Sequence, residues 1–63
     1  MWRSASSIDK IPTDRDLRLA VIDALGKVHA LVFPCRRIGY RLVDARSERT
    51  VDVRPTHWQD WVE

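Results

Sequence analysis

The side chains best suited to chemistry in this sequence are the single cysteine and the two histidines. Cys35 is followed by Arg36 and Arg37, and adjacent cations lower the pKa of a thiol. A catalytic cysteine also needs a general base within hydrogen-bond reach, and the sequence places neither His29 nor His57 beside it. We therefore interpret Cys35 as an inert thiol at the end of a strand, with an activated thiolate as the alternative.

The spacing of these residues does not indicate a metal site. Structural zinc sites usually bring two ligands within about two to five residues of each other, whereas the gaps between His29, Cys35 and His57 are wider. The acidic residues are scattered, with no convergent pair for general acid and base chemistry. A chain of 63 residues also leaves little room for a ligand pocket. We expect no metal, no cofactor and no enzymatic activity.

The region from residue 36 to residue 54 holds six arginines against three acidic residues, a net charge of +3. Arginine makes bidentate contacts to phosphate and stacks on bases, so the candidate nucleic-acid contacts are Arg36, Arg37, Arg46 and Arg54. The whole chain carries only +2, and it lacks an RNA-recognition signature and a glycine-rich phosphate loop. Nucleic-acid binding is therefore the second hypothesis for function, with a solvated, salt-bridged hairpin face as its alternative.

The elements that position these residues are expected to begin with a helix. Residues 1–12 have no sustained hydrophobic period and are expected to form a mobile arm, followed by one domain over 13–63. Thr13 has the character of a helix N-cap and Gly26 that of a helix stop. Between them, five apolar residues follow the helical spacing: Leu17, Ala20, Val21, Ala24 and Leu25. Leu19 lies off this stripe, so we expect it to face solvent or, in the alternative, a partner.

Residues 28–33 predict a strand that Pro34 ends, because proline cannot donate to a ladder. Both faces of this strand are apolar, so His29, Leu31 and Phe33 need cover on the second face, either from the C-terminal turn or from a second copy of the chain. Residues 38–54 predict a hairpin in which Leu42 pairs with Val51. This register also opposes arginines and aspartates, and it leaves a four-residue loop over 45–48.

The C-terminal residues 56–63 predict a short helix that begins at Thr56 and carries two tryptophans on one face. Burial of one tryptophan removes on the order of 200 Å² from water, or roughly 5 kcal/mol gross. We interpret Trp58 and Trp61 as structural anchors that cover the strand face containing His29, Leu31 and Phe33. If either tryptophan is exposed, this turn becomes a partner surface instead.

Together these elements predict an α+β domain in the order helix, strand, strand, strand, short helix, with a three-stranded, mostly antiparallel sheet. One cysteine and the absence of a signal segment or a membrane-spanning apolar run indicate a soluble cytoplasmic protein. A domain this small has little core, so the first hypothesis for function is a protein-interaction module that binds an unknown protein or a second copy of itself. The candidate interface residues are Leu19, Leu31 and Phe33.

Overall fold

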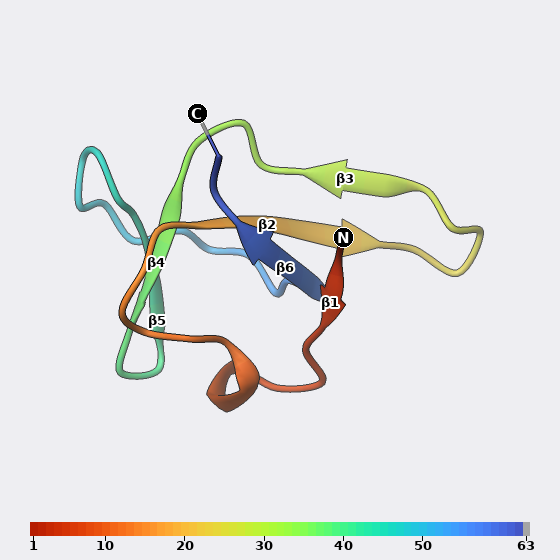
Figure 1. Cartoon of the computed structure of the whole chain (residues 1–63), viewed down its shortest axis with the longest axis horizontal. Helices are drawn as coiled ribbons and strands as arrows, with labels where there is room; N and C mark the ends of the chain where they lie inside the picture. The colour runs from red at the N-terminus through yellow and green to blue at the C-terminus, as the bar shows by residue number, and fades with distance from the viewer. Residues whose placement is uncertain (63) are drawn as a thin grey trace.

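The structure, a computed structural model, describes residues 1–62, and this range contains six strands, one short 3-10 helix and no α-helix (Figure 1). The elements are β1 (Arg3–Ser4), the 3-10 helix η1 (Ile8–Lys10), β2 (Leu17–Ile22), β3 (Val28–Ala30), β4 (Cys35–Ile38), β5 (Arg41–Asp44) and β6 (His57–Asp60). All strand pairings are antiparallel. The expected α+β fold with helices at both ends is therefore wrong, and the domain is nearly all β.

β2 is the central strand of the sheet, whose order is β1-β6-β2-β4-β5 with β3 also paired to β2. On one side of β2, residues 17–20 pair with β6. On the other side, Leu17 pairs with β4, and residues 20–22 pair with β3. β4 and β5 run across the direction of β2 (Figure 1), so the sheet is strongly curved.

The segment expected to be an N-terminal helix forms β2. Leu17 and Leu19 are both fully buried, whereas a helix would have turned Leu19 away from the stripe that contains Leu17. Alternate burial of this kind follows the period of two of a strand. The spacing of apolar residues in this segment fits a helix and a strand about equally well. The strand is favoured because β2 forms backbone hydrogen bonds to neighbouring strands on both of its sides.

The turn between β2 and β3 is closed by Asp23. Its carboxylate Oδ1 accepts hydrogen bonds from the backbone N–H groups of Leu25 and Lys27 at 2.9 and 3.0 Å. Gly26 has a φ of +82°, the left-handed conformation that glycine adopts without a Cβ clash. The residue expected to stop a helix thus forms the tip of a hairpin.

Two further hairpins build the opposite end of the sheet. The first joins β4 to β5 through Gly39, with φ +61°, and Tyr40, and a glycine at the first central position is typical of a type II′ turn. The second has the predicted register over residues 42–44 and 49–51. Val43 pairs with Thr50, and the N–H of Val51 donates to the carbonyl oxygen of Leu42 at 2.8 Å. The expected four-residue loop over 45–48 is therefore confirmed.

The C-terminal residues form β6 in place of the expected short helix. β6 pairs with β2 on one side and with β1 on the other. The backbone N–H of Trp61 donates to the carbonyl oxygen of Asp16 at 3.1 Å, which extends the pairing beyond β6. An isolated helix of this length is not stable in water, whereas a strand here gains two neighbours. Glu63, the last residue of the expected domain, lies outside the described range.

The core lies inside the curve of the sheet and includes residues from the expected mobile arm. Its buried cluster consists of Ala5, Ile11, Leu17, Leu19, Cys35 and Leu42. Ala5 and Ile11 come from residues 1–12, and the N–H of Ala5 donates to the carbonyl oxygen of Thr56 at 2.8 Å. Residues 1–12 are thus placed against the rest of the domain. Within residues 1–62 the structure has no helix that could span a bilayer.

Candidate protein-interaction surface

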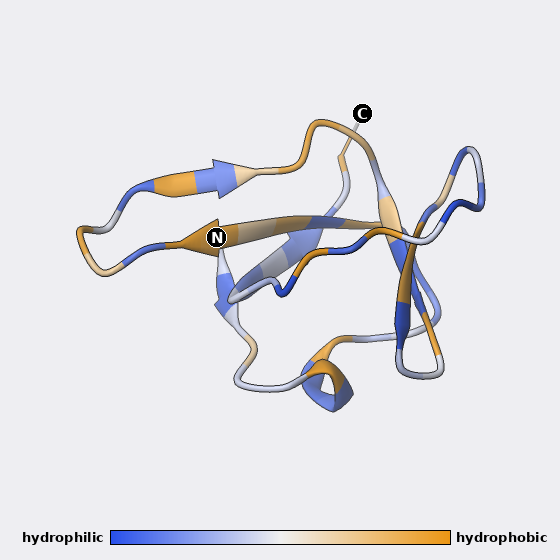
Figure 2. Ribbon diagram, turned by 180° about the vertical axis from the view of Figure 1, so that it is seen from behind, coloured by the Kyte–Doolittle hydropathy of each residue, from blue (hydrophilic) through white to orange (hydrophobic). Residues whose placement is uncertain are grey.

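The outer edge of β3 has no neighbouring strand in the part of the chain that the structure describes. β3 pairs with β2 alone, through residues 20–22. In Figures 1 and 2 no other segment lies beside the outer edge of β3, and the β2–β3 hairpin projects from the rest of the fold. An unpaired edge presents free backbone donors and acceptors, which is the requirement for adding another strand.

Two hydrogen bonds show which backbone groups of β3 point outward. The N–H of Leu31 donates to the carbonyl oxygen of Leu19 at 2.9 Å, and the N–H of Asp23 donates to that of Lys27 at 3.1 Å. Residues in an antiparallel strand alternate between facing the partner strand and facing away from it. The odd-numbered residues of this strand therefore face β2. The N–H and C=O groups of Val28 and Ala30 face the open edge.

The side chains of Val28, Ala30 and Val32 at this edge are apolar and exposed. All three residues of β3 are exposed, Val28 at 49%, and Val32 just beyond the strand is 87% exposed. Natural edge strands are usually protected by charged residues, proline or a bulge. Here Lys27 and Pro34 lie outside the strand, and His29 is held toward Asp23, with 3.4 Å between Nε2 and Oδ2. The edge is therefore open to pairing over residues 28–32.

The three residues named as interface candidates lie on the core side of the sheet. Leu19 is fully buried in the core cluster, and Leu31 and Phe33 are partly buried against it. The second face of residues 28–33 is thus covered by the core. The face that contains Val28, Ala30 and Val32 is the uncovered one, and nothing in the sequence distinguishes the two.

The four candidate nucleic-acid contacts come from three segments, with Arg36 and Arg37 adjacent in β4. The Nε of Arg36 is 2.7 Å from Asp16 Oδ1, and Arg37 donates to the carbonyl oxygens of Gly39 and Ile11 at 2.7 and 2.8 Å. Both guanidinium groups are thus engaged within the fold. Two candidates remain to be placed: Arg46 lies in the loop 45–48, and Arg54 lies in the segment before β6.

Trp58 and Trp61 are both half-buried, and an arginine guanidinium lies over each ring. Trp58 packs against the core cluster, with the Arg3 guanidinium 5.5 Å from its ring centroid. Trp61 has the Arg18 guanidinium 4.9 Å from its ring centroid, and its buried Nε1 has no hydrogen-bond partner. Trp58 therefore packs against the same core cluster as Leu31 and Phe33, whereas Trp61 is not among the residues that pack against it.

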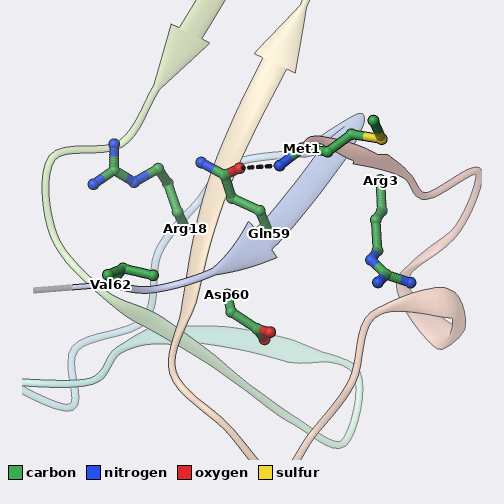
Figure 3. Close-up of a pocket in the computed structure, with 6 residues that line it drawn as sticks. All are labelled: Met1, Arg3, Arg18, Gln59, Asp60 and Val62. Atoms are coloured by element: carbon green, nitrogen blue, oxygen red, sulfur yellow. Dashed lines mark hydrogen bonds between the residues drawn. The ribbon is translucent and has the colours of Figure 1, made fainter.

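A shallow groove of ≈ 700 Å³ lies near the chain ends (Figure 3). Arg3 and Arg18 lie on opposite sides of β6, and the N-terminal amine donates to Gln59 Oε1 at 3.3 Å (Figure 3). Asp60 also lines the groove, and its Oδ1 is 3.4 Å from Arg15 Nη1. Charges of both signs line this groove, so it does not select for an anion or a cation.

The thiol of Cys35 is fully buried, with Sγ 3.7 Å from the carbonyl oxygen of Phe33. Burial, and secondarily the carboxylate of Asp44, raises the pKa of Cys35 to about 11. The thiol is therefore protonated at neutral pH. Among residues 1–62, no three histidine, cysteine, aspartate or glutamate side chains are grouped so as to hold a metal ion.

Comparison of the chain with protein-family models, with curated proteins and with solved structures finds no match.

Proposed function

We propose that this protein is a non-enzymatic protein-interaction module that self-associates through the outer edge of β3. The observation that supports this proposal is the unpaired edge formed by Val28 and Ala30, whose exposed side chains are apolar. Strand addition at such an edge takes its affinity from main-chain hydrogen bonds and its specificity from alternate side chains.

A second copy fits this edge because the edge is complementary to itself. Antiparallel pairing about a two-fold axis at Ala30 sets Ala30 opposite Ala30 and Val28 opposite Val32 of the second copy. His29 then lies opposite Leu31, so no like charges meet. Each favourable cross-strand pair contributes roughly 0.2–1 kcal/mol. The pairing also covers Val32, which is 87% exposed in one copy.

The size of the domain favours such an assembly. A chain of 63 residues buries only about 60% of its unfolded surface, and its core rarely supplies more than roughly 3–5 kcal/mol of net stability. Continuing the sheet across two copies gives each chain additional buried backbone and apolar surface. A second subunit is one of the few ways in which a small domain without disulfides is stabilised.

The non-enzymatic part of the proposal rests on Cys35, the one nucleophile that the sequence suggested, which is buried and has a raised pKa. A cytoplasmic location is also part of the proposal. It is supported by the single cysteine, which is a free and buried thiol, as expected in a reducing compartment.

Size-exclusion chromatography with light scattering tests self-association over a range of protein concentrations. We expect a mass of two chains at high concentration that declines on dilution. A mass of one chain throughout the tens-of-micromolar range and above would contradict the proposal. Retention of the dimer when the β3 edge is blocked would place the interface elsewhere and would also contradict it.

A further inference from the structure

A second groove, lined by basic side chains, lies near β1, at a different edge of the sheet from β3. We call it the basic groove, and its volume is ≈ 880 Å³. Its lining includes Arg3, Ser4, Ser6, Lys10, Arg54 and Trp58. β1 lies beyond β6 in the sheet, whereas β3 lies beyond β2, so the basic groove and the β3 edge are separate surfaces.

Three cations line the basic groove, and none of the residues that line it is acidic. Arg3 belongs to β1, Lys10 to η1, and Arg54 to the segment before β6. The ion pairs found within residues 1–62 include none of these three side chains. The carboxylate of Asp9, next to Lys10 in sequence, does not line the groove; a hydrogen bond from the Ser7 hydroxyl and, more weakly, the charge of Lys10 lower its pKa, so it stays ionised beside Lys10. The groove therefore presents positive charge to solvent.

The remaining lining adds hydrogen-bond donors and flat surfaces. The hydroxyl groups of Ser4 and Ser6 can donate to phosphate oxygens. The Arg3 guanidinium lies over the Trp58 ring at 5.5 Å from the centroid. Guanidinium planes and aromatic rings are the surfaces on which unpaired bases stack, and the adjacent cations contact the backbone.

We propose that the basic groove binds the sugar–phosphate backbone of a single-stranded nucleic acid. Its volume lies within the range of roughly 300–1,000 Å³ that encloses a drug-sized ligand, which is more than one phosphate group requires. Separate cations along an open groove suit successive phosphates of a strand. This proposal places the nucleic-acid contacts in the basic groove, which forms only in the folded chain, and not in the arginine-rich region 36–54 as a whole. Of the four candidate contacts in the sequence, Arg54 alone lines it.

Fluorescence anisotropy with a labelled single-stranded DNA of about 10 nucleotides tests the proposal at two salt concentrations, about 20 and about 150 mM. The groove variant is Lys10→Gln with Arg54→Gln. The matched control is Arg41→Gln with Arg49→Gln, which removes the same amount of positive charge. Neither residue lines the basic groove, and neither takes part in the ion pairs above. Circular dichroism melting confirms that both variants fold.

We expect the groove variant to lose about tenfold or more in affinity at low salt. The slope of log affinity against log salt concentration should be smaller in magnitude by about 2. The control should lose less than about threefold, from the change in net charge alone. Equal losses in both variants would overturn the groove, as would the absence of salt-dependent binding by the wild-type chain. A mononucleotide and the unlabelled oligonucleotide are compared as competitors at equal phosphate concentration. If the mononucleotide competes as strongly, the assignment to a single-stranded nucleic acid is overturned. The dimer measurement above does not depend on any of these results.

Discussion

The backbone N–H of Leu31 donates to the carbonyl oxygen of Leu19 at 2.9 Å, one residue beyond the end of β3. This bond sets the direction of every backbone group along the strand. Because Leu31 faces β2, Ala30 and Val28 face away from it. The same bond joins two core leucine positions, one fully buried and one partly buried. The pairing of β3 with β2 therefore both places Leu31 against the core and leaves the backbone groups of Val28 and Ala30 at the free edge.

The first prediction concerns a charge placed on the free edge. Val28→Lys should convert the dimer to a monomer, because lysine at an edge strand opposes pairing with another edge. Ile38→Lys is the matched control, since Ile38 in β4 is 52% exposed and Val28 is 49% exposed. Light scattering at one fixed protein concentration should report a monomer for the first variant and a dimer for the second. A dimer in both variants would refute the interface.

The second prediction uses the alternation of backbone groups. Ala30→Pro removes an N–H that points outward, so it should abolish the dimer while retaining the fold of one chain. His29→Pro removes an N–H that faces β2 and should lower the free energy of unfolding by more than about 1 kcal/mol. Light scattering and urea unfolding together distinguish the two variants. Equal destabilisation by both would show that Ala30 does not face outward.

The third prediction compares two leucines of opposite exposure. Leu19 is fully buried and Leu25 is 88% exposed. Leu19→Ala should cost about 2–5 kcal/mol, which is comparable to the whole expected stability of a domain this size and should remove its cooperative melting transition. Leu19→Met should cost less than about 1.5 kcal/mol, and Leu25→Ala less than about 0.5 kcal/mol. Similar melting temperatures for Leu19→Ala and Leu25→Ala would contradict the strand assignment of β2.

The fourth prediction concerns Cys35 and alkaline pH. Burial raises the pKa of this thiol from 9.0 to about 11, so the unfolded chain releases its proton before the folded chain does. The thiol therefore makes no difference to stability below pH 9 and lowers it progressively between pH 9 and 11. Urea unfolding should show that the free energy of unfolding decreases more between pH 8 and pH 10 for the wild-type chain than for Cys35→Ala.

Alkylation provides an independent measurement on the same thiol. Iodoacetamide should label native Cys35 slowly at pH 8 and label the urea-unfolded chain fast, because the thiolate is the reactive form and the folded thiol is inaccessible. Rapid labelling of the folded protein would show that Cys35 is not buried.

Local sequence signals predicted the features that depend on near neighbours. The register of Val43 against Thr50, the loop over 45–48 and the left-handed conformation of Gly26 were all predictable. Opposed charges and apolar residues specify a hairpin register locally, and only glycine adopts positive φ without cost. The β4–β5 hairpin was missed because Ile38 and Leu42 were assigned to one continuous strand, although Gly39 marks the turn between them.

The features that depend on distant partners were not predictable in this way. Residues 17–25 satisfy a helical spacing, and the decision for a strand came from β6, about forty residues away in sequence. The uncovered face of residues 28–33 had the same ambiguity, because both faces are apolar. The basic groove combines Lys10 with Arg54, and no local pattern links those positions.

The sequence by itself determined that the chain has a single thiol and a basic excess between residues 36 and 54, and it predicted the hairpin register around the loop 45–48. These properties follow from composition and from interactions between neighbouring residues. The tertiary structure decided that residues 17–22 and 57–60 are strands, that Leu19 is buried, and that the outer edge of β3 is open. The physical reason is that a strand is stabilised by hydrogen bonds to other strands, and the identity of those partners is not encoded within the segment itself.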